Sequence, residues 1–227
     1  MSRCNGPWVP NAILKNRQVI KQSVPSWAVP FAKPPQAPVS ARAPSDLGGD
    51  KVLPGGAPQG AETAKRVGTA VHRLLEVLPN APQDQWGNIA ERLIEADVRA
   101  SACQEAGAVL QRPDLAHIFA PESLAEVDVT AHLPELNGDP IQGSIDRLLV
   151  SPTRVLAVDF KTNQIVPSEA EQVPSGLLRQ MGAYAAALSQ IYPDHDIETA
   201  ILWTKTLELM PLPKDLVISS LTNTPLT

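Results

Sequence analysis

Val155-Leu156-Ala157-Val158-Asp159-Phe160-Lys161-Thr162 is the stretch that decides the fold. Its apolar residues are typical of a strand buried on both faces. Asp159 and Lys161 are two positions apart, so their side chains leave the strand on the same face. Because burying an isolated charge is costly, this pair needs a partner, a metal ion or a catalytic role.

A second acid, Asp146, lies thirteen residues upstream in Gly143-Ser144-Ile145-Asp146-Arg147-Leu148. An acid on one strand and Asp-x-Lys on the next can form a divalent-metal site for phosphodiester hydrolysis. The carboxylates bind the ion, and the ammonium positions or activates the attacking water. The alternative is a plain Lys–Asp ion pair on an edge strand.

The hydrophobic periodicity predicts the other elements. Helical spacing predicts a helix from Ala61 that Pro79 ends, a helix over 89–110 and a short one near 116–119. Alternation predicts strands over 125–133 and 141–150, which form an antiparallel meander with the strand 154–161. A helix over 177–191, a buried strand over 197–203 and a further strand over 207–212 follow. This order predicts an α/β (α+β) fold with a central mixed sheet flanked by helices.

Several polar residues lie beside the predicted core. His72 borders the apolar stripe of its helix, where Gly68 permits close approach of another backbone. By itself, His72 is interpreted as a histidine at the boundary of the core, with a metal ligand as the alternative. Gln180 and Tyr184 are at i and i+4, so they share a helix face that can reach the site. Glu126 and Asp128 lie on the polar face of the first strand. Both are interpreted as solvated charges. The alternative is that Glu126 is a third acid of the metal site.

The N-terminal region has a different composition. Residues 1–60 hold ten of the 23 prolines, so we expect a Pro-rich linker or disordered tail before a catalytic domain over 61–227. Trp8 and Trp27 within it are interpreted either as docking residues or as isolated apolar residues.

Charge and cysteine content narrow the function classes. The net charge is −5, and residues 1–50 hold six Lys/Arg against two Asp/Glu. An excess of acidic residues is unfavourable for contact with DNA phosphates. A nuclease of this composition is therefore expected to obtain much of its DNA affinity from other subunits or domains. Two cysteines exclude a disulfide framework and four-cysteine metal sites within the chain. No secretory signal or membrane span is apparent, so a cytoplasmic location is expected.

Four motifs in order resemble the RecB-type branch of the PD-(D/E)xK nuclease superfamily. They are Gly68-x-x-x-His72, Gly143-Ser144-Ile145-Asp146-Arg147-Leu148, Val158-Asp159-Phe160-Lys161-Thr162 and Gln180-x-x-x-Tyr184. Glu126-Val127-Asp128-Val129 and Leu202-Trp203-Thr204 are similar to segments of AddA-type nuclease domains. The resemblance covers about residues 62–213 and implies a restriction-endonuclease-like core.

The resemblance also implies roles for individual residues. His72, Asp146, Asp159 and the backbone carbonyl of Phe160 are expected to bind Mg²⁺ or Mn²⁺. Lys161 is expected to be the catalytic lysine, with Gln180 and Tyr184 lining the site and contacting DNA.

The resemblance further implies a DNA nuclease, with exonuclease action favoured, that acts on single-stranded ends during double-strand-break resection and recombinational repair. AddA-type proteins carry a helicase ahead of the nuclease domain, so a helicase and an AddB-like subunit are the expected partners. The alternative is a non-catalytic docking or DNA-binding module of such a complex.

Overall fold

The computed structural model describes residues 40–53 and 60–224. Within them, the helices and strands follow one another as α1 (Ala61–Val77), α2 (Trp86–Leu93), α3 (Ala96–Leu110), β1 (Leu124–Leu133), β2 (Asp139–Val150), β3 (Arg154–Lys161), α4 (Ser175–Ile191), β4 (Asp196–Trp203), β5 (Glu208–Leu212) and α5 (Lys214–Thr222). Short 3₁₀ turns include Pro44–Asp46 before α1 and Pro113–Phe119 between α3 and β1.

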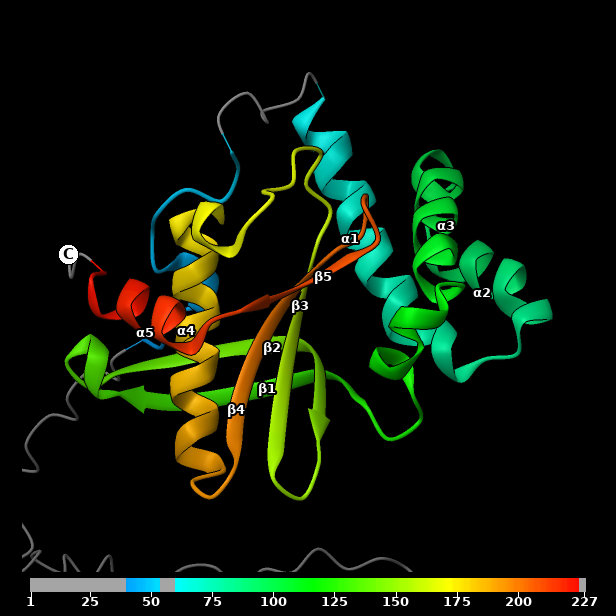
Figure 1. The fold of residues 1–227 in the computed structure, drawn as a ribbon. Coiled ribbons are helices and arrows are strands. Elements are labelled where there is room, and N and C mark those ends of the chain that lie inside the picture. The colour runs from blue at the N-terminus through cyan, green and yellow to red at the C-terminus, as the bar shows by residue number, and fades with distance from the viewer. Residues whose placement is uncertain (1–39, 54–59, 225–227) are drawn as a thin grey trace, which may run out of the picture. The chain divides into compact units, whose positions relative to one another are not determined.

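The described residues form a mixed five-stranded sheet in the order β1-β2-β3-β4-β5 (Figure 1). Strands β1 to β3 make the predicted antiparallel meander, whereas β3 and β4 are parallel. The long connection through α4 allows this parallel pairing. Because β3 is central, the edge-strand interpretation of the Asp159–Lys161 pair is wrong.

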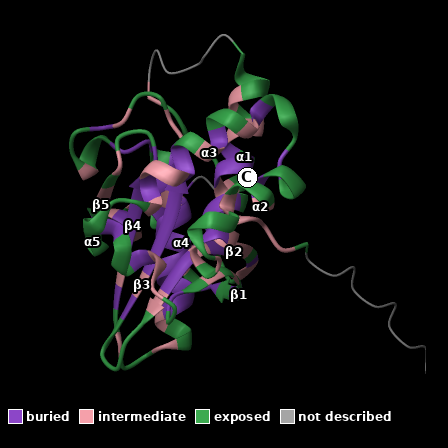
Figure 2. Cartoon of the chain, turned by 90° about the vertical axis from the view of Figure 1, so that its right-hand side faces the viewer, coloured by how far each residue is buried: buried purple, intermediate pink, exposed green. Residues whose placement is uncertain are grey.

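Helices cover both faces of the sheet and confirm the predicted fold class. The core on one face joins the strands to α4 and α5, and the core on the other joins them to α1, α2, α3 and Pro113–Phe119. Figure 2 shows the strands buried between helices whose outer faces are exposed. Successive residues of β3 enter opposite cores, so Val155 and Ala157 face α4 whereas Leu156 and Val158 face the other layer.

The prediction of one helix over 89–110 is wrong, because α2 ends at Leu93 and α3 begins at Ala96. Ile94 and Glu95 have extended backbone, with ψ of 133° and 142°. Arg66 of α1 donates to the carboxylates of Glu95 and Asp97 at this break. The Nε of Arg99 donates to the Ile94 carbonyl at 3.1 Å. Tertiary contacts therefore stabilise the break between α2 and α3, which no Gly or Pro in the sequence indicates.

Helix α5 was not predicted. It packs against α4 at Gly182, where a Cβ atom would lie 2.3 Å from the Val217 carbonyl oxygen. Only a glycine permits this approach.

Residues 40–53 lie along α4, and the amide of Gly176 donates to the Asp50 carbonyl at 2.8 Å. The proposed division at residue 60 stays a prediction, and Trp8 and Trp27 lie outside the described residues. Among the described helices, none is both long and apolar enough to cross a membrane.

Candidate metal and nuclease site

The candidate site lies where β2 and β3 separate. Their ladder ends at the pair Arg147 and Val158. Beyond this point the Phe160 amide donates to Oδ2 of Asp146 at 2.5 Å. The other oxygen of Asp146, Oδ1, lies 3.1 Å from Nδ1 of His72 on α1. Strand separation thus places the Asp146 carboxylate between a backbone amide of β3 and an imidazole of α1.

The His72–Asp146 contact changes the proton affinity of the imidazole. Burial lowers the pKa of His72, but the hydrogen bond to Asp146 and the negative charges of Asp146 and Asp159 outweigh it. The pKa of His72 is therefore raised above its ordinary value. The ring also packs edge-on against Phe160, with 5.7 Å between ring centroids.

Glu126 joins the site from β1. Its backbone is in the left-handed region, with φ of 49°, a strained conformation for a non-glycine residue. Paired positions of β1 and β2 flank it on both sides, so Glu126 stands opposite Asp146. Partial burial and the charge of Asp146 raise the pKa of the Glu126 carboxyl, although the residue is exposed overall. Ser144 donates to this carboxylate at 3.1 Å.

Asp159 and Lys161 form the predicted same-face pair on the α4 side of the sheet. Their side chains make an ion pair, and both are mostly buried, with 4% and 19% of the side chain exposed. Gln180 of α4 donates from Nε2 to Oδ1 of Asp159 at 2.6 Å. Burial raises the pKa of Asp159, the charge of Lys161 opposes this shift, and the charge of Asp146 adds to it.

Tyr184 ties the same helix to β2. Its hydroxyl donates to the Ser144 carbonyl at 2.6 Å and lies 3.5 Å from Nε2 of Gln180. A Cβ at Gly143 would lie 3.3 Å from that hydroxyl and 2.7 Å from Pro44. Burial and the charge of Asp159 raise the pKa of Tyr184, which keeps the phenol protonated as a donor.

Gly68 permits a close approach, but of a side chain rather than of the predicted backbone. A Cβ at Gly68 would lie 2.9 Å from Oγ1 of Thr162, which directly follows Lys161. The absent side chain therefore lets α1 approach the end of β3 and brings His72 to the site.

His72, Glu126 and Asp146 could hold a cation. Each offers one ligand atom, and these atoms all lie within 4.8 Å of one another. Carboxylate oxygens suit Mg²⁺ and Mn²⁺, and imidazole suits transition ions such as Mn²⁺. The negative charges of Glu126 and Asp146 repel each other, and a bound cation would relieve this repulsion. The donor set fits a divalent metal ion, while Asp159 is held beside it by Lys161 and Gln180.

The structure connects the predicted side chains by contacts, since His72 meets Asp146, and Asp159 meets Lys161 and Gln180. Asp159 was predicted as a metal ligand but is not part of the group that could hold a cation. Glu126 was the one undervalued by the sequence interpretation, which favoured a solvated charge. In the sequence, the only indication of this role is the position of Glu126 at the start of the predicted strand 125–133, within the segment Glu126-Val127-Asp128-Val129. Asp128, the other acid of that segment, is exposed and is not part of the ligand group.

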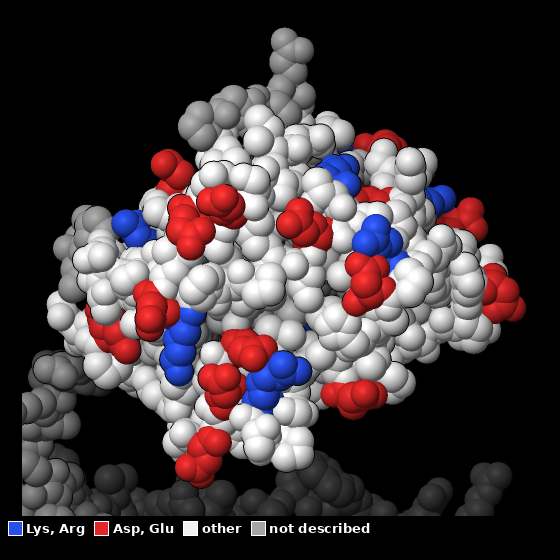
Figure 3. Space-filling view, viewed as in Figure 1, with Lys and Arg blue, Asp and Glu red and all other residues white. Residues whose placement is uncertain are grey.

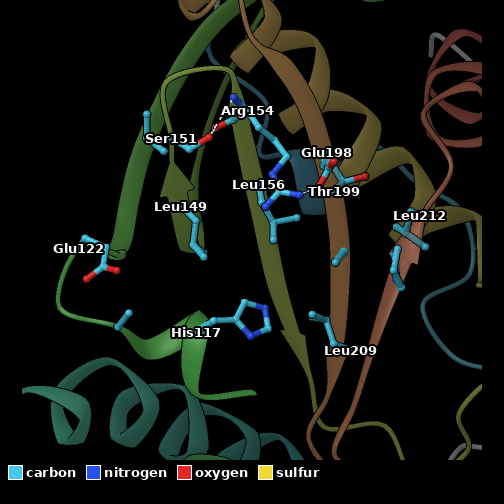
Figure 4. A pocket seen from close by; sticks show the side chains of 14 residues that line it. His117, Glu122, Leu149, Ser151, Arg154, Leu156, Glu198, Thr199, Leu209 and Leu212 are labelled. Atoms are coloured by element: carbon cyan, nitrogen blue, oxygen red, sulfur yellow. Dashed lines mark hydrogen bonds and ion pairs between the residues drawn. The ribbon is translucent and has the colours of Figure 1, made fainter. Parts of the chain in front are cut away.

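The surface charge is mixed on one face of the molecule (Figure 3). On the face shown in Figure 3, Lys and Arg side chains are scattered among Asp and Glu. A separate cavity of about 490 Å³ lies at the opposite end of β3 from Lys161. Arg154, Leu156 and His117 line it, and it contains no residue of the candidate site (Figure 4).

A family model described as the PD-(D/E)XK nuclease superfamily matches residues 47–208, more than half of the chain. The match includes all the residues of the candidate site. No curated protein matches the sequence.

Proposed function

Because the chain belongs to the PD-(D/E)XK nuclease superfamily, we propose that it is a deoxyribonuclease whose site hydrolyses phosphodiester bonds with Mg²⁺ or Mn²⁺. One observation carries this proposal. The Asp146 carboxylate meets His72 and the Phe160 amide at the point where the buried Asp159–Lys161 pair ends β3. Acidic ligands, an imidazole and an ammonium in one place are the groups that metal-assisted hydrolysis needs.

His72, Asp146, Asp159 and the Phe160 carbonyl are the proposed metal ligands, and Glu126 is added to them on the strength of its position. A bound divalent ion would neutralise charge on the phosphate and lower the pKa of a bound water. The Phe160 amide fixes the orientation of Asp146 by occupying one oxygen. The other oxygen remains directed toward His72.

Lys161 is proposed to orient the attacking water and to stabilise negative charge on the phosphate. Its ion pair with Asp159 holds the ammonium at the end of β3. Gln180 orients Asp159 through a direct hydrogen bond, and Tyr184 fixes α4 to β2. These contacts keep the water-activating group and the metal-binding carboxylates on rigid elements, which precise catalysis requires.

The narrower function follows the resemblance to AddA-type nuclease domains. We propose exonuclease action on single-stranded DNA ends during double-strand-break resection and recombinational repair. A helicase and an AddB-like subunit would deliver the strand. The net charge of −5 supports a need for such partners, because neutralisation of phosphates by Lys and Arg dominates DNA affinity.

The alternative is a non-catalytic docking or DNA-binding module. The two functions are separated by incubating end-labelled single-stranded DNA with the chain in Mn²⁺, in EDTA and in Ca²⁺. We expect cleavage in Mn²⁺ that EDTA abolishes and that Asp146→Asn reduces about 100-fold or more. The matched control is Asp128→Asn, which alters an exposed acid outside the ligand group and should cleave like the wild type. If the chain binds the labelled DNA in Ca²⁺ but does not cleave it in Mn²⁺, the result would favour the binding module.

A further inference from the structure

Arg147 is a buried cation directly beside the candidate metal ligands. Only 2% of the residue is exposed. Among the described residues it forms no salt bridge with a carboxylate. Its Nε also has no hydrogen-bond partner there. A buried guanidinium without a paired carboxylate is costly, so its other contacts must compensate.

Those contacts converge on the last turn of α1. Nη2 of Arg147 donates to the Leu75 carbonyl at 2.6 Å, and a longer contact of 3.5 Å reaches the Glu76 carbonyl. Carbonyls in the last turn of a helix have no hydrogen-bond donor within the helix. They also bear the partial negative charge of the helix dipole. The last turn of α1 contains no basic residue of its own. Arg147 of β2 therefore supplies the positive charge for this helix end.

The flat side of the guanidinium is also supported. Its Cζ lies 5.2 Å from the centre of the Phe119 ring, and Nη1 lies 3.3 Å from the Ser123 hydroxyl. Phe119 packs on Phe160 at 5.9 Å, and Phe160 packs on His72. Two packed aromatic rings, Phe119 and Phe160, thus connect Arg147 with the His72 imidazole at the site.

Two neighbouring residues of β2 consequently hold α1 at two points. Asp146 contacts His72, and Arg147 contacts the Leu75 carbonyl, three residues further along the helix. We propose that Arg147 is a positioning residue that fixes the distance between His72 and Asp146 by tying the end of α1 to β2. This inference rests on the proposed function, in which those two residues bind the metal ion.

The test measures Mn²⁺ binding to the full chain by isothermal titration calorimetry, without DNA, together with metal-free thermal unfolding. Arg147→Met keeps the length of the side chain and removes its donors. It is expected to weaken Mn²⁺ binding about 10- to 100-fold, the usual effect of removing a group that orients a ligand. Arg147→Lys keeps a charge and a donor, and is expected to lose only about 2- to 10-fold.

Ile197→Ala is the matched control, because Ile197 is buried in the opposite core at the start of β4. It should lower the Tm and leave the Mn²⁺ affinity unchanged. The proposal is overturned if Arg147→Met binds Mn²⁺ like the wild type, or if Ile197→Ala weakens binding as much. If Arg147→Met does not fold, Arg147→Lys decides, and wild-type affinity in that variant overturns the proposal. A wild-type chain that binds no Mn²⁺ would instead refute the proposed metal site itself.

Discussion

Replacing Glu126 by Gln should have opposite effects on stability without and with metal. The ligand atoms of Glu126 and Asp146 lie within 4.8 Å of each other, and the two carboxylates face one another across β1 and β2. Two like charges at that distance repel by ~0.9 kcal/mol in water. Like-charged pairs directly across strands are destabilising by roughly 0.2–1 kcal/mol. Since Glu126 is exposed, we expect Glu126→Gln to raise the metal-free free energy of unfolding by about 0.5–1 kcal/mol.

At saturating Mn²⁺ the order should reverse. Loss of an anionic oxygen ligand is expected to weaken binding about tenfold, which removes ~1.4 kcal/mol of metal-dependent stabilisation. The difference leaves the variant below the wild type by about 0.4–0.9 kcal/mol. For a domain of this size, either change corresponds to a Tm shift of about 1–4 °C.

The assay is thermal unfolding of both proteins across a Mn²⁺ titration, with Asp128→Asn as the control. Glu126→Gln should unfold at a higher temperature than the wild type in EDTA and at a lower one in saturating Mn²⁺. The control lies on the same strand, outside the ligand group, and should follow the wild type at every concentration. Parallel curves for the wild type and Glu126→Gln would refute a metal-binding role for Glu126.

Two further predictions concern packing and pH. Gly182→Ala places a Cβ 2.3 Å from the Val217 carbonyl oxygen, so α5 must move and stability should fall by about 1–3 kcal/mol. The same change at Gly107, where a Cβ meets nothing within 4 Å, should stabilise α3 by up to ~1 kcal/mol, and equal Tm values for the two variants would contradict the packing argument. Because the pKa of His72 is raised above 6.5 by Asp146, the stability that this contact gives the metal-free protein is complete below pH 6.5 and is lost as pH rises through the folded-state pKa. Mn²⁺ binding needs the neutral ring and should weaken as pH falls through that value, so calorimetric affinities that are unchanged between pH 8 and 6 would exclude His72 as a ligand.

Short-range patterns explain why much of the fold could be predicted. The strand Arg154–Lys161 appears at its predicted bounds, because apolar residues and the turn Ser151-Pro152-Thr153 specify it locally. The spacing of Asp159 and Lys161 placed them on one face, and the i, i+4 spacing of Gln180 and Tyr184 placed both toward β2 and β3.

Long-range contacts explain what the sequence did not reveal. Glu126 enters the site through its left-handed backbone and its position opposite Asp146, and neither property follows from strand alternation. The break between α2 and α3 depends on Arg66, which comes from another helix. Arg147 was visible only as the residue after Asp146, and its contacts with α1 appear only when the helix is packed on the sheet.

The most direct test of the central claim is cleavage of labelled single-stranded DNA by the purified chain in Mg²⁺ or Mn²⁺, compared with Asp159→Ala and Lys161→Ala. These changes remove the two members of the buried pair at the end of β3. The account predicts metal-dependent cleavage by the wild type, none in EDTA, and loss of cleavage in both folded variants. Undiminished metal-dependent cleavage by either variant would contradict it.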